Sequence, residues 1–307
     1  MQSNIENDEI DLKELFFNFW AYRFKIFVIT SIFALSSLIY SLSLSDQYKA
    51  TVVLAPSQSS QGGLSSALGQ LGGFASVAGL NLDKTEVDEA KIAQEVMRSW
   101  SFIDHFISEN DLMAEVYAVT GWNKQLNQYE VDKTIYDTQN KKWLYKNRAD
   151  IIGPPTSWTL YEEFLKKLEV SLDKQTGLVT LSIEHYSPYV AKEWVDMYLQ
   201  AINSYMQQRR IERITNNIDY LSEQIDQTQI NEMRTAFFNI MEEQIKNKML
   251  AEASPEYVFV TVSPAMVPEL KSKPSRALIC ILLTFLGFVL SLVYVIISNY
   301  FRDEDNT

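Results

Sequence analysis

The residue types that most often carry chemistry are few in this 307-residue chain, and they do not combine into a site. The one cysteine, Cys280, lies inside an apolar run, and neither His105 nor His185 has a second ligand at a metal-binding spacing. Neighbouring carboxylates such as Glu162 and Glu163 point to different sides of a helix, which is typical of a solvated face. We therefore expect no catalytic residue, no metal site and no cofactor, and we expect both histidines to be structural.

Nucleotide and nucleic-acid binding are also disfavoured. Six of the ten glycines lie in residues 56–79, but neither GxxxxGK[ST] nor GxGxxG occurs there. This segment is also rich in leucine, which favours a loop that tucks between subunits over a plain linker. The formal net charge of −12 argues against nucleic acid as a partner, because phosphates would be repelled.

Two apolar runs, at residues 25–45 and 276–298, are long enough to cross a lipid bilayer. A cleaved signal peptide is the rival interpretation of the first run, but a clear A-x-A cleavage site is missing. Basic residues flank both sides of the spans equally, and Arg23 and Lys25 before the first span favour cytoplasmic termini. The sequence thus predicts a cytoplasmic segment (1–24), an extracytoplasmic domain (46–275) and a cytoplasmic tail (299–307).

Both predicted spans carry small residues at three- and four-residue steps, which places them on one helix face. They are Ala34 and Ser37 in the first span, and Thr284, Gly287 and Ser291 in the second. Small side chains let transmembrane helices approach closely. We predict packing at these positions, either between the two spans or between subunits.

The domain between the spans mixes helical and alternating patterns, so we predict an α+β fold. A turn at residues 174–177 joins two of its predicted strands into a hairpin. Strands are predicted at 47–54, 168–173, 178–184 and 257–263, and helices at 84–108, 157–167 and 188–253.

The last of these helices is predicted to form a long helical arm. Its apolar spacing tightens into a coiled-coil seam and then slips at residues 227–229. The seam residues are Ile211, Ile214, Ile218, Leu221 and Ile225. The helix is either one rod of roughly 90 Å or two unequal arms folded at the slip. Packing between subunits is favoured over packing within one domain, because the opposite face is charged.

The approach to the second span contains Pro264, Pro268 and Pro274, followed by Arg276. Prolines at this spacing prevent regular helix and sheet. A segment that needed only flexibility would use glycine and serine instead. We therefore favour a stiff strap over a plain connector.

Several of these stretches resemble the Wzz chain-length determinants, the polysaccharide co-polymerases of Gram-negative bacteria. The resemblance covers nearly the whole chain, and its most specific part is the proline segment before the second span. It rests on Ile10-Asp11-Leu12, residues 48–56, Ser187-Pro188 with Ala191, Trp194-Val195 and Asn203, Tyr220-Leu221, residues 256–259, and Pro264-Ala265, Pro268, Lys273-Pro274 and Arg276.

This resemblance implies two transmembrane helices that bracket a periplasmic α/β base with a long helical protrusion. The chain would form a closed ring on the bacterial inner membrane, act with a Wzy-type polymerase on a glycan growing on a lipid carrier, and catalyse nothing. It would set the modal length of O-antigen, since the nine residues after Ser298 leave no room for the kinase of the capsule branch. Two alternatives stay open from the residues alone: a two-span periplasmic sensor and an export adaptor protein.

Overall fold

The computed structural model describes residues 20, 22–57, 89–146 and 151–304. Most of the glycine-rich segment and the first 19 residues lie outside this part, so the loop predicted at 56–79 is not described beyond residue 57. The chain divides into two units, which we describe separately: Gln47–Lys271, and Met1–Asp46 together with Ser272–Thr307.

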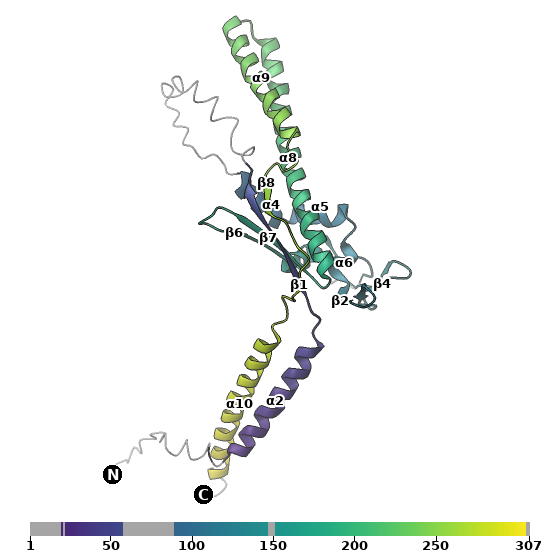
Figure 1. Ribbon diagram of the computed structural model, residues 1–307, viewed down its shortest axis with the longest axis vertical. Helices are drawn as coiled ribbons and strands as arrows, with labels where there is room; N and C mark the ends of the chain where they lie inside the picture. Colours follow the sequence, from purple (N-terminus) through teal and green to yellow (C-terminus); the bar gives the residue numbers. More distant parts are fainter. Residues whose placement is uncertain (1–19, 21, 58–88, 147–150, 305–307) are drawn as a thin grey trace, which may run out of the picture. The chain divides into compact units, whose positions relative to one another are not determined.

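The larger unit is built on a four-stranded antiparallel sheet in the order β6-β7-β1-β8 (Figure 1). Its strands are β1 (Tyr48–Pro56), β6 (Leu168–Leu172), β7 (Val179–His185) and β8 (Phe259–Ser263). Each lies where an alternating pattern predicted it, within two residues at either end. The predicted turn between β6 and β7 is also confirmed, because Gly177 adopts a positive φ of 71° and donates its N–H to the Asp173 carbonyl.

Helix α8 (Pro188–Gln227) packs its first five turns against this sheet. Pro188 lies in the first turn, where its missing N–H costs nothing. The helical spacing read from the sequence matches the buried face, which consists of Ala191, Trp194, Val195, Tyr198 and Ile202. These side chains meet Val179, Leu181 and Ile183 of β7 in one hydrophobic core.

Three shorter helices complete this core: α4 (Glu89–Arg98), α5 (Trp100–Glu109) and α7 (Ser157–Lys167). The α7 bounds agree with the prediction, and the helical pattern predicted over 84–108 is confirmed from Glu89 onward, where it forms α4 and α5 instead of one continuous helix. The chain breaks at Ser99, whose hydroxyl caps α5 by accepting from the Phe102 N–H at 3.4 Å. The remaining elements are α6 (Met113–Tyr117) and two small sheets, β2 (Val119–Asn123) with β3 (Gln128–Val131), and β4 (Tyr136–Asp137) with β5 (Lys142–Trp143).

The long helix predicted over 188–253 is interrupted where its apolar pattern slips. Helix α8 ends at Gln227, and α9 (Asn231–Glu252) runs back along it as a hairpin (Figure 1). The Gln207 side chain closes the base of the hairpin by donating to the carbonyls of Ala251 and Ser254, at 2.7 and 3.0 Å. We call residues 207–252 the arm, and of the two predicted geometries the structure has the folded one.

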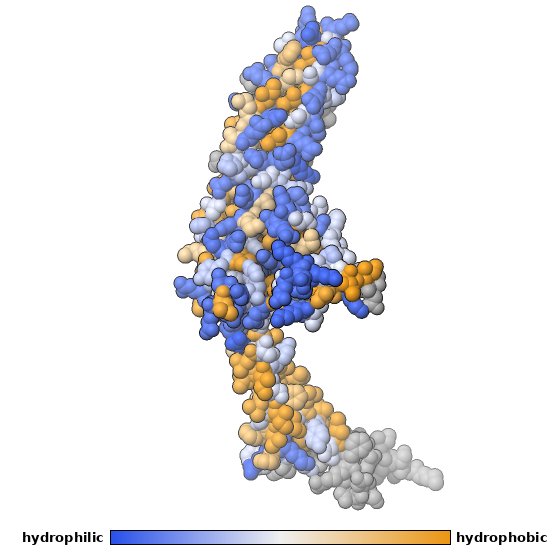
Figure 2. Space-filling view, turned by 90° about the vertical axis from the view of Figure 1, so that its right-hand side faces the viewer, coloured by the Kyte–Doolittle hydropathy of each residue, from blue (hydrophilic) through white to orange (hydrophobic). Residues whose placement is uncertain are grey.

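The smaller unit consists of two apolar helices, α2 (Arg23–Ser43) and α10 (Arg276–Glu304). Both Arg23–Ser43 and Arg276–Ser298 are long and apolar enough to span a membrane. Figure 2 shows that hydrophobic residues cover most of their visible surface. At one end of the unit, the Arg276 guanidinium pairs with the Asp46 carboxylate at 2.9 Å. The α+β class with two apolar terminal helices is therefore confirmed.

His185 at the end of β7 makes the stability of the larger unit depend on pH. Its ring is 1 % exposed, packs 4.9 Å from the Trp194 ring, and accepts the Ser187 N–H at Nδ1. Burial, and secondarily the nearby Lys167 charge, lower the pKa of His185 to about 3. The folded-state pKa of His185 lies below the unfolded value near 6.5. Its contribution to the free energy of unfolding is therefore fully present above pH 6.5 and is lost as the pH falls toward 3, because the unfolded state then binds a proton that the folded state does not.

We therefore expect the free energy of unfolding to fall by about 1.4 kcal/mol per pH unit below 6.5 through this group alone. His185→Asn keeps an acceptor but cannot titrate, so its unfolding free energy should vary less between pH 6.5 and 5, by about 2 kcal/mol. Chemical unfolding across this range measures the difference. His105→Asn is the matched control, since the His105 side chain is exposed and its Nε2 lies 3.2 Å from the exposed Glu109 carboxylate. Equal pH slopes in the wild type and His185→Asn would contradict the prediction.

Candidate functional site

The seam predicted from heptad spacing lies on the side of α8 along which α9 runs. Ile214 and Ile225 are 2 % and 5 % exposed within a single chain, while Ile211, Ile218 and Leu221 are half-buried. The sequence favoured packing between subunits, but Ile214 and Ile225 need no second subunit to be buried. A subunit interface at this seam therefore stays a prediction that concerns its half-buried members.

We expect Ile218→Asp to disrupt the arm or the assembly of subunits. A carboxylate at a half-buried apolar position costs about 1–3 kcal/mol unless the helices separate. The mass of the solubilised protein and the protease resistance of the arm measure the two effects. Asn217→Asp is the control, because Asn217 is the preceding residue, is exposed and gains the same negative charge. Wild-type mass and wild-type protease resistance in Ile218→Asp would show that the seam has neither role.

The arm also carries large apolar side chains that its own helices do not cover. Figure 2 shows such residues on its surface among hydrophilic ones. They include Tyr220, Phe238, Ile245, Met249 and Leu250. Exposed apolar residues of this number on a two-helix hairpin are typical of a protein–protein contact surface.

The small residues predicted to pack in the membrane lie between α2 and α10. Ser37 is 1 % exposed, Ser291 is 0 % exposed, and Gly287 is buried. A Cβ atom built on Gly287 would lie 2.4 Å from the Cβ of Phe33, so only glycine permits this approach. Ala34 and Thr284 are half-buried on the same two helices. Of the two predicted arrangements, the structure places these residues between the spans of one chain.

The predicted strap of prolines has neither helix nor strand at Pro264 and Pro268. Ala265 between them is 5 % exposed and belongs to the hydrophobic core, which ties this end of the segment to the larger unit. Pro274 belongs to the smaller unit and lies two residues before the start of α10. The role of a stiff strap stays a prediction.

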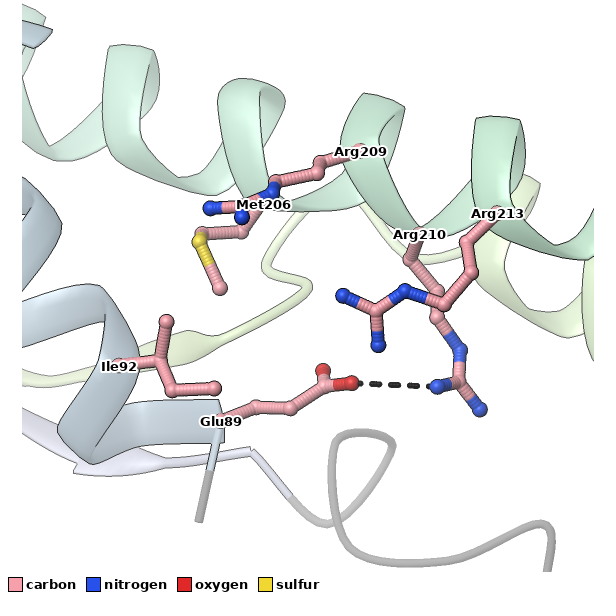
Figure 3. Close-up of a pocket in the computed structure, with 6 residues that line it drawn as sticks. All are labelled: Glu89, Ile92, Met206, Arg209, Arg210 and Arg213. Atoms are coloured by element: carbon pink, nitrogen blue, oxygen red, sulfur yellow. Dashed lines mark hydrogen bonds and ion pairs between the residues drawn. The ribbon is translucent and has the colours of Figure 1, made fainter. Parts of the chain in front are cut away.

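A hollow that the sequence did not indicate lies where α4 begins beside α8. Its lining consists of Glu89, Ile92, Met206, Arg209, Arg210 and Arg213. Three arginines come from little more than one turn of α8, and Ile92 and Met206 supply an apolar wall. Figure 3 shows the Arg213 guanidinium reaching toward the Glu89 carboxylate, which is paired with Arg210.

The Glu89 carboxylate is held by two partners from distant parts of the chain. The Arg210 Nη1 lies 3.4 Å from Glu89 Oε1, and the Tyr257 hydroxyl donates to Oε2 at 2.8 Å. Tyr257 is 2 % exposed, and its burial together with the Glu89 charge raises the pKa of its hydroxyl. The hydroxyl therefore stays protonated as a donor. Among the described residues, Arg209 and Arg213 have no carboxylate within ion-pair distance.

Sequence reasoning placed the three arginines on the charged face of the predicted arm and went no further. Glu89 is 121 residues away from Arg210 and 168 away from Tyr257, so no local spacing connects the three. The only local signal was the spacing of Arg209, Arg210 and Arg213 on one side of a helix.

The described residues offer candidate binding surfaces along the arm and at the arginine hollow. They contain no group of three or more His, Cys, Asp and Glu side chains that could hold a metal ion. Cys280 lies inside the second candidate span, and His185 is buried against aromatic rings. These surfaces can make apolar contacts along the arm and the spans and electrostatic contacts at the arginine hollow.

Residues 8–110 match the family model described as chain length determinant protein, Wzz. The resemblance to the Wzz family is confirmed over these residues, which do not include the proline segment. The matched Wzz segment contains the first candidate span, β1, α4 and α5. No curated protein matches the chain.

Solved structures of co-polymerases are also similar to this chain. A full-length bacterial polysaccharide co-polymerase is 13 % identical, with 95 % of this chain and 99 % of that chain covered and a TM-score of 0.41. A fragment of the co-polymerase WzzB from Salmonella Typhimurium is 13 % identical, with 75 % and 100 % covered and a TM-score of 0.31. A point mutant of the lipopolysaccharide O-antigen chain-length regulator WzzBSF from Shigella flexneri is 9 % identical, with 74 % and 100 % covered and a TM-score of 0.21.

Proposed function

We propose that this chain regulates the modal length of a bacterial surface polysaccharide, O-antigen in the first instance, without catalysing a reaction. The observation that carries the proposal is the match of residues 8–110 to the Wzz chain length determinant family. In this role the chain works as an oligomeric scaffold in the inner membrane, next to a Wzy-type polymerase that performs the chemistry.

The two candidate spans support the proposed location. If Arg23–Ser43 and Arg276–Ser298 both cross the inner membrane, the unit Gln47–Lys271 lies on one side and both termini lie on the other. Arg23 and Lys25 before the first span favour cytoplasmic termini and a periplasmic domain.

The uncovered apolar surface of the arm supports the proposed oligomer. Side chains such as Phe238, Met249 and Leu250 are half or more exposed in one chain. Burying them against a second copy would remove this apolar area from water, at roughly 25 cal/mol per Å². A closed ring satisfies every such surface, because each subunit offers the same pair of faces to its neighbours.

A deletion strain tests the proposal directly. Gel separation of the surface polysaccharide should show a modal length in the wild type, its loss in the deletion strain, and its return with the plasmid-borne gene. Polymer should persist in the deletion strain, since the scaffold does not form the bonds. An unchanged length distribution in the deletion strain would refute the proposal, and loss of all polymer would indicate a catalytic role.

A further inference from the structure

The arginine hollow holds more positive charge than its own residues balance. The lining holds three guanidinium groups and one carboxylate, that of Glu89, which already accepts from Arg210 and from the Tyr257 hydroxyl. The excess is unusual in this chain, where 39 acidic residues outnumber 27 basic ones. Arginines four apart on a helix, such as Arg209 and Arg213, also repel each other in the absence of an anion.

The partners of Glu89 keep the hollow ready for a ligand. The ion pair with Arg210 and the Tyr257 hydroxyl fix the position of the Glu89 carboxylate, whose single negative charge cannot balance all three arginines. In Figure 3 the Arg213 guanidinium lies beside the Glu89 carboxylate, and the Arg209 guanidinium lies beside Met206. A planar guanidinium presents two parallel N–H donors, which match the oxygens of a carboxylate or a phosphate.

The wall of the hollow restricts what carries the anion. Ile92 and Met206 offer apolar atoms beside the charged groups, so a ligand that binds well has a C–H surface next to its oxyanion. A small inorganic ion would use only the charge. A sugar ring that carries a carboxylate or a phosphate offers both an apolar C–H face and, a few bonds away, an oxyanion.

We propose that this hollow binds a saccharide through an attached oxyanion, a carboxylate or a phosphate. Arg213 and Arg209 hold the oxyanion, Met206 and Ile92 contact the ring, and the Glu89–Arg210 pair positions the wall of the site. The inference rests on the proposed function, in which the chain regulates the length of a glycan, and it gives that glycan a binding site on this chain.

The two sources of the oxyanion are separable by experiment. The full chain in phosphatidylcholine nanodiscs is titrated calorimetrically with glucuronate, with glucose 1-phosphate and with glucose. We expect both charged sugars to bind more tightly at low than at high ionic strength, and glucose not to bind. The tighter of the two charged sugars identifies the source, an acidic sugar of the polymer or a sugar phosphate. Failure of both to bind, or equal binding of glucose, would overturn the inference.

Two substitutions with opposite expected effects locate the binding. Arg213→Gln should weaken the binding of the charged sugars about fivefold to tenfold, because it removes the guanidinium group with its positive charge and its two parallel N–H donors. Glu89→Gln should tighten it severalfold, because it removes the competing carboxylate while keeping an acceptor for the Tyr257 hydroxyl. Arg234→Gln, at an exposed position on α9 outside the hollow, is the control for losing one positive charge.

Equal weakening by Arg213→Gln and Arg234→Gln would show non-specific charge attraction and would overturn the assignment to the hollow. The deletion strain separates this inference from the proposed function. Loss of the modal length there, together with no binding of charged sugars, would leave the length-regulating role standing and remove only the site.

Discussion

Gly287→Leu should separate the two apolar helices of the smaller unit. A Cβ atom at residue 287 would lie 2.4 Å from the Cβ and 2.5 Å from the Cγ of Phe33. Rotating the Phe33 side chain cannot relieve the first contact, because a Cβ atom is fixed by the backbone. The helices must therefore move apart. Overpacking of this kind costs about 1–3 kcal/mol, so we expect a lower unfolding midpoint in neutral detergent and an altered glycan length distribution.

A rescue experiment shows whether the contact itself is responsible. Phe33→Gly combined with Gly287→Leu removes both the Cβ and the ring that leucine meets and should recover part of the lost stability. Val289→Leu is the control on the same helix, since Val289 is 38 % exposed and the added methylene has room. A Gly287→Leu protein with the wild-type midpoint and the wild-type glycan length would show that close packing of α2 and α10 is not needed.

Asn203→Ala should strongly destabilise the larger unit. The Asn203 side chain is 4 % exposed and links α8 to the start of β8 through three hydrogen bonds. Its Oδ1 accepts from the N–H groups of Val258 and Phe259, at 3.0 and 2.9 Å, and its Nδ2 donates to the Phe259 carbonyl at 3.0 Å. Alanine leaves all three backbone groups buried without these partners.

Each such group costs about 1–3 kcal/mol, so we expect a loss of roughly 3–6 kcal/mol in the free energy of unfolding. This corresponds to a fall of roughly 10 °C in the unfolding midpoint of a domain of this size. Circular dichroism during heating measures it. Asn216→Ala, an exposed site on the same helix, should change stability by less than about 0.5 kcal/mol. Similar midpoints for the two variants would contradict the role given to Asn203.

Periodicity predicted the elements whose burial is one-sided. The alternation in β1, β6 and β7 and the helical spacing of Trp194, Tyr198 and Ile202 translate directly into the buried faces of the sheet and of α8. Such patterns succeed because one face of each element packs on a core and the other is solvated. The break at Ser99 escaped prediction because the apolar spacing continues through it, and neither proline nor glycine marks it.

Features that join distant segments escaped prediction for another reason. The sequence located the slip near Thr228 but could not decide between a rod and a hairpin, since the outcome depends on how α9 packs on α8. The arginine hollow needs Glu89, Arg210 and Tyr257 to meet, and the hydrogen-bonding role of Asn203 needs β8 to lie beside α8. The small residues of the spans were identified, but whether they face each other or a second subunit required the fold.

The continuity of α8 has a mechanical consequence. Its 40 residues form one hydrogen-bonded rod of about 60 Å, with one end embedded in the core around Trp194 and the other at the far end of the hairpin. A stiff rod held over its first five turns acts as a lever, so a rotation of roughly 5° of the embedded part carries the free end, roughly 30 Å beyond the core, through about 3 Å. Conversely, a load on the free end is transmitted as torque to the sheet rather than absorbed by bending along the way. A sub-ångström repacking around Trp194 would thus be amplified into a displacement large enough for a neighbouring molecule to sense.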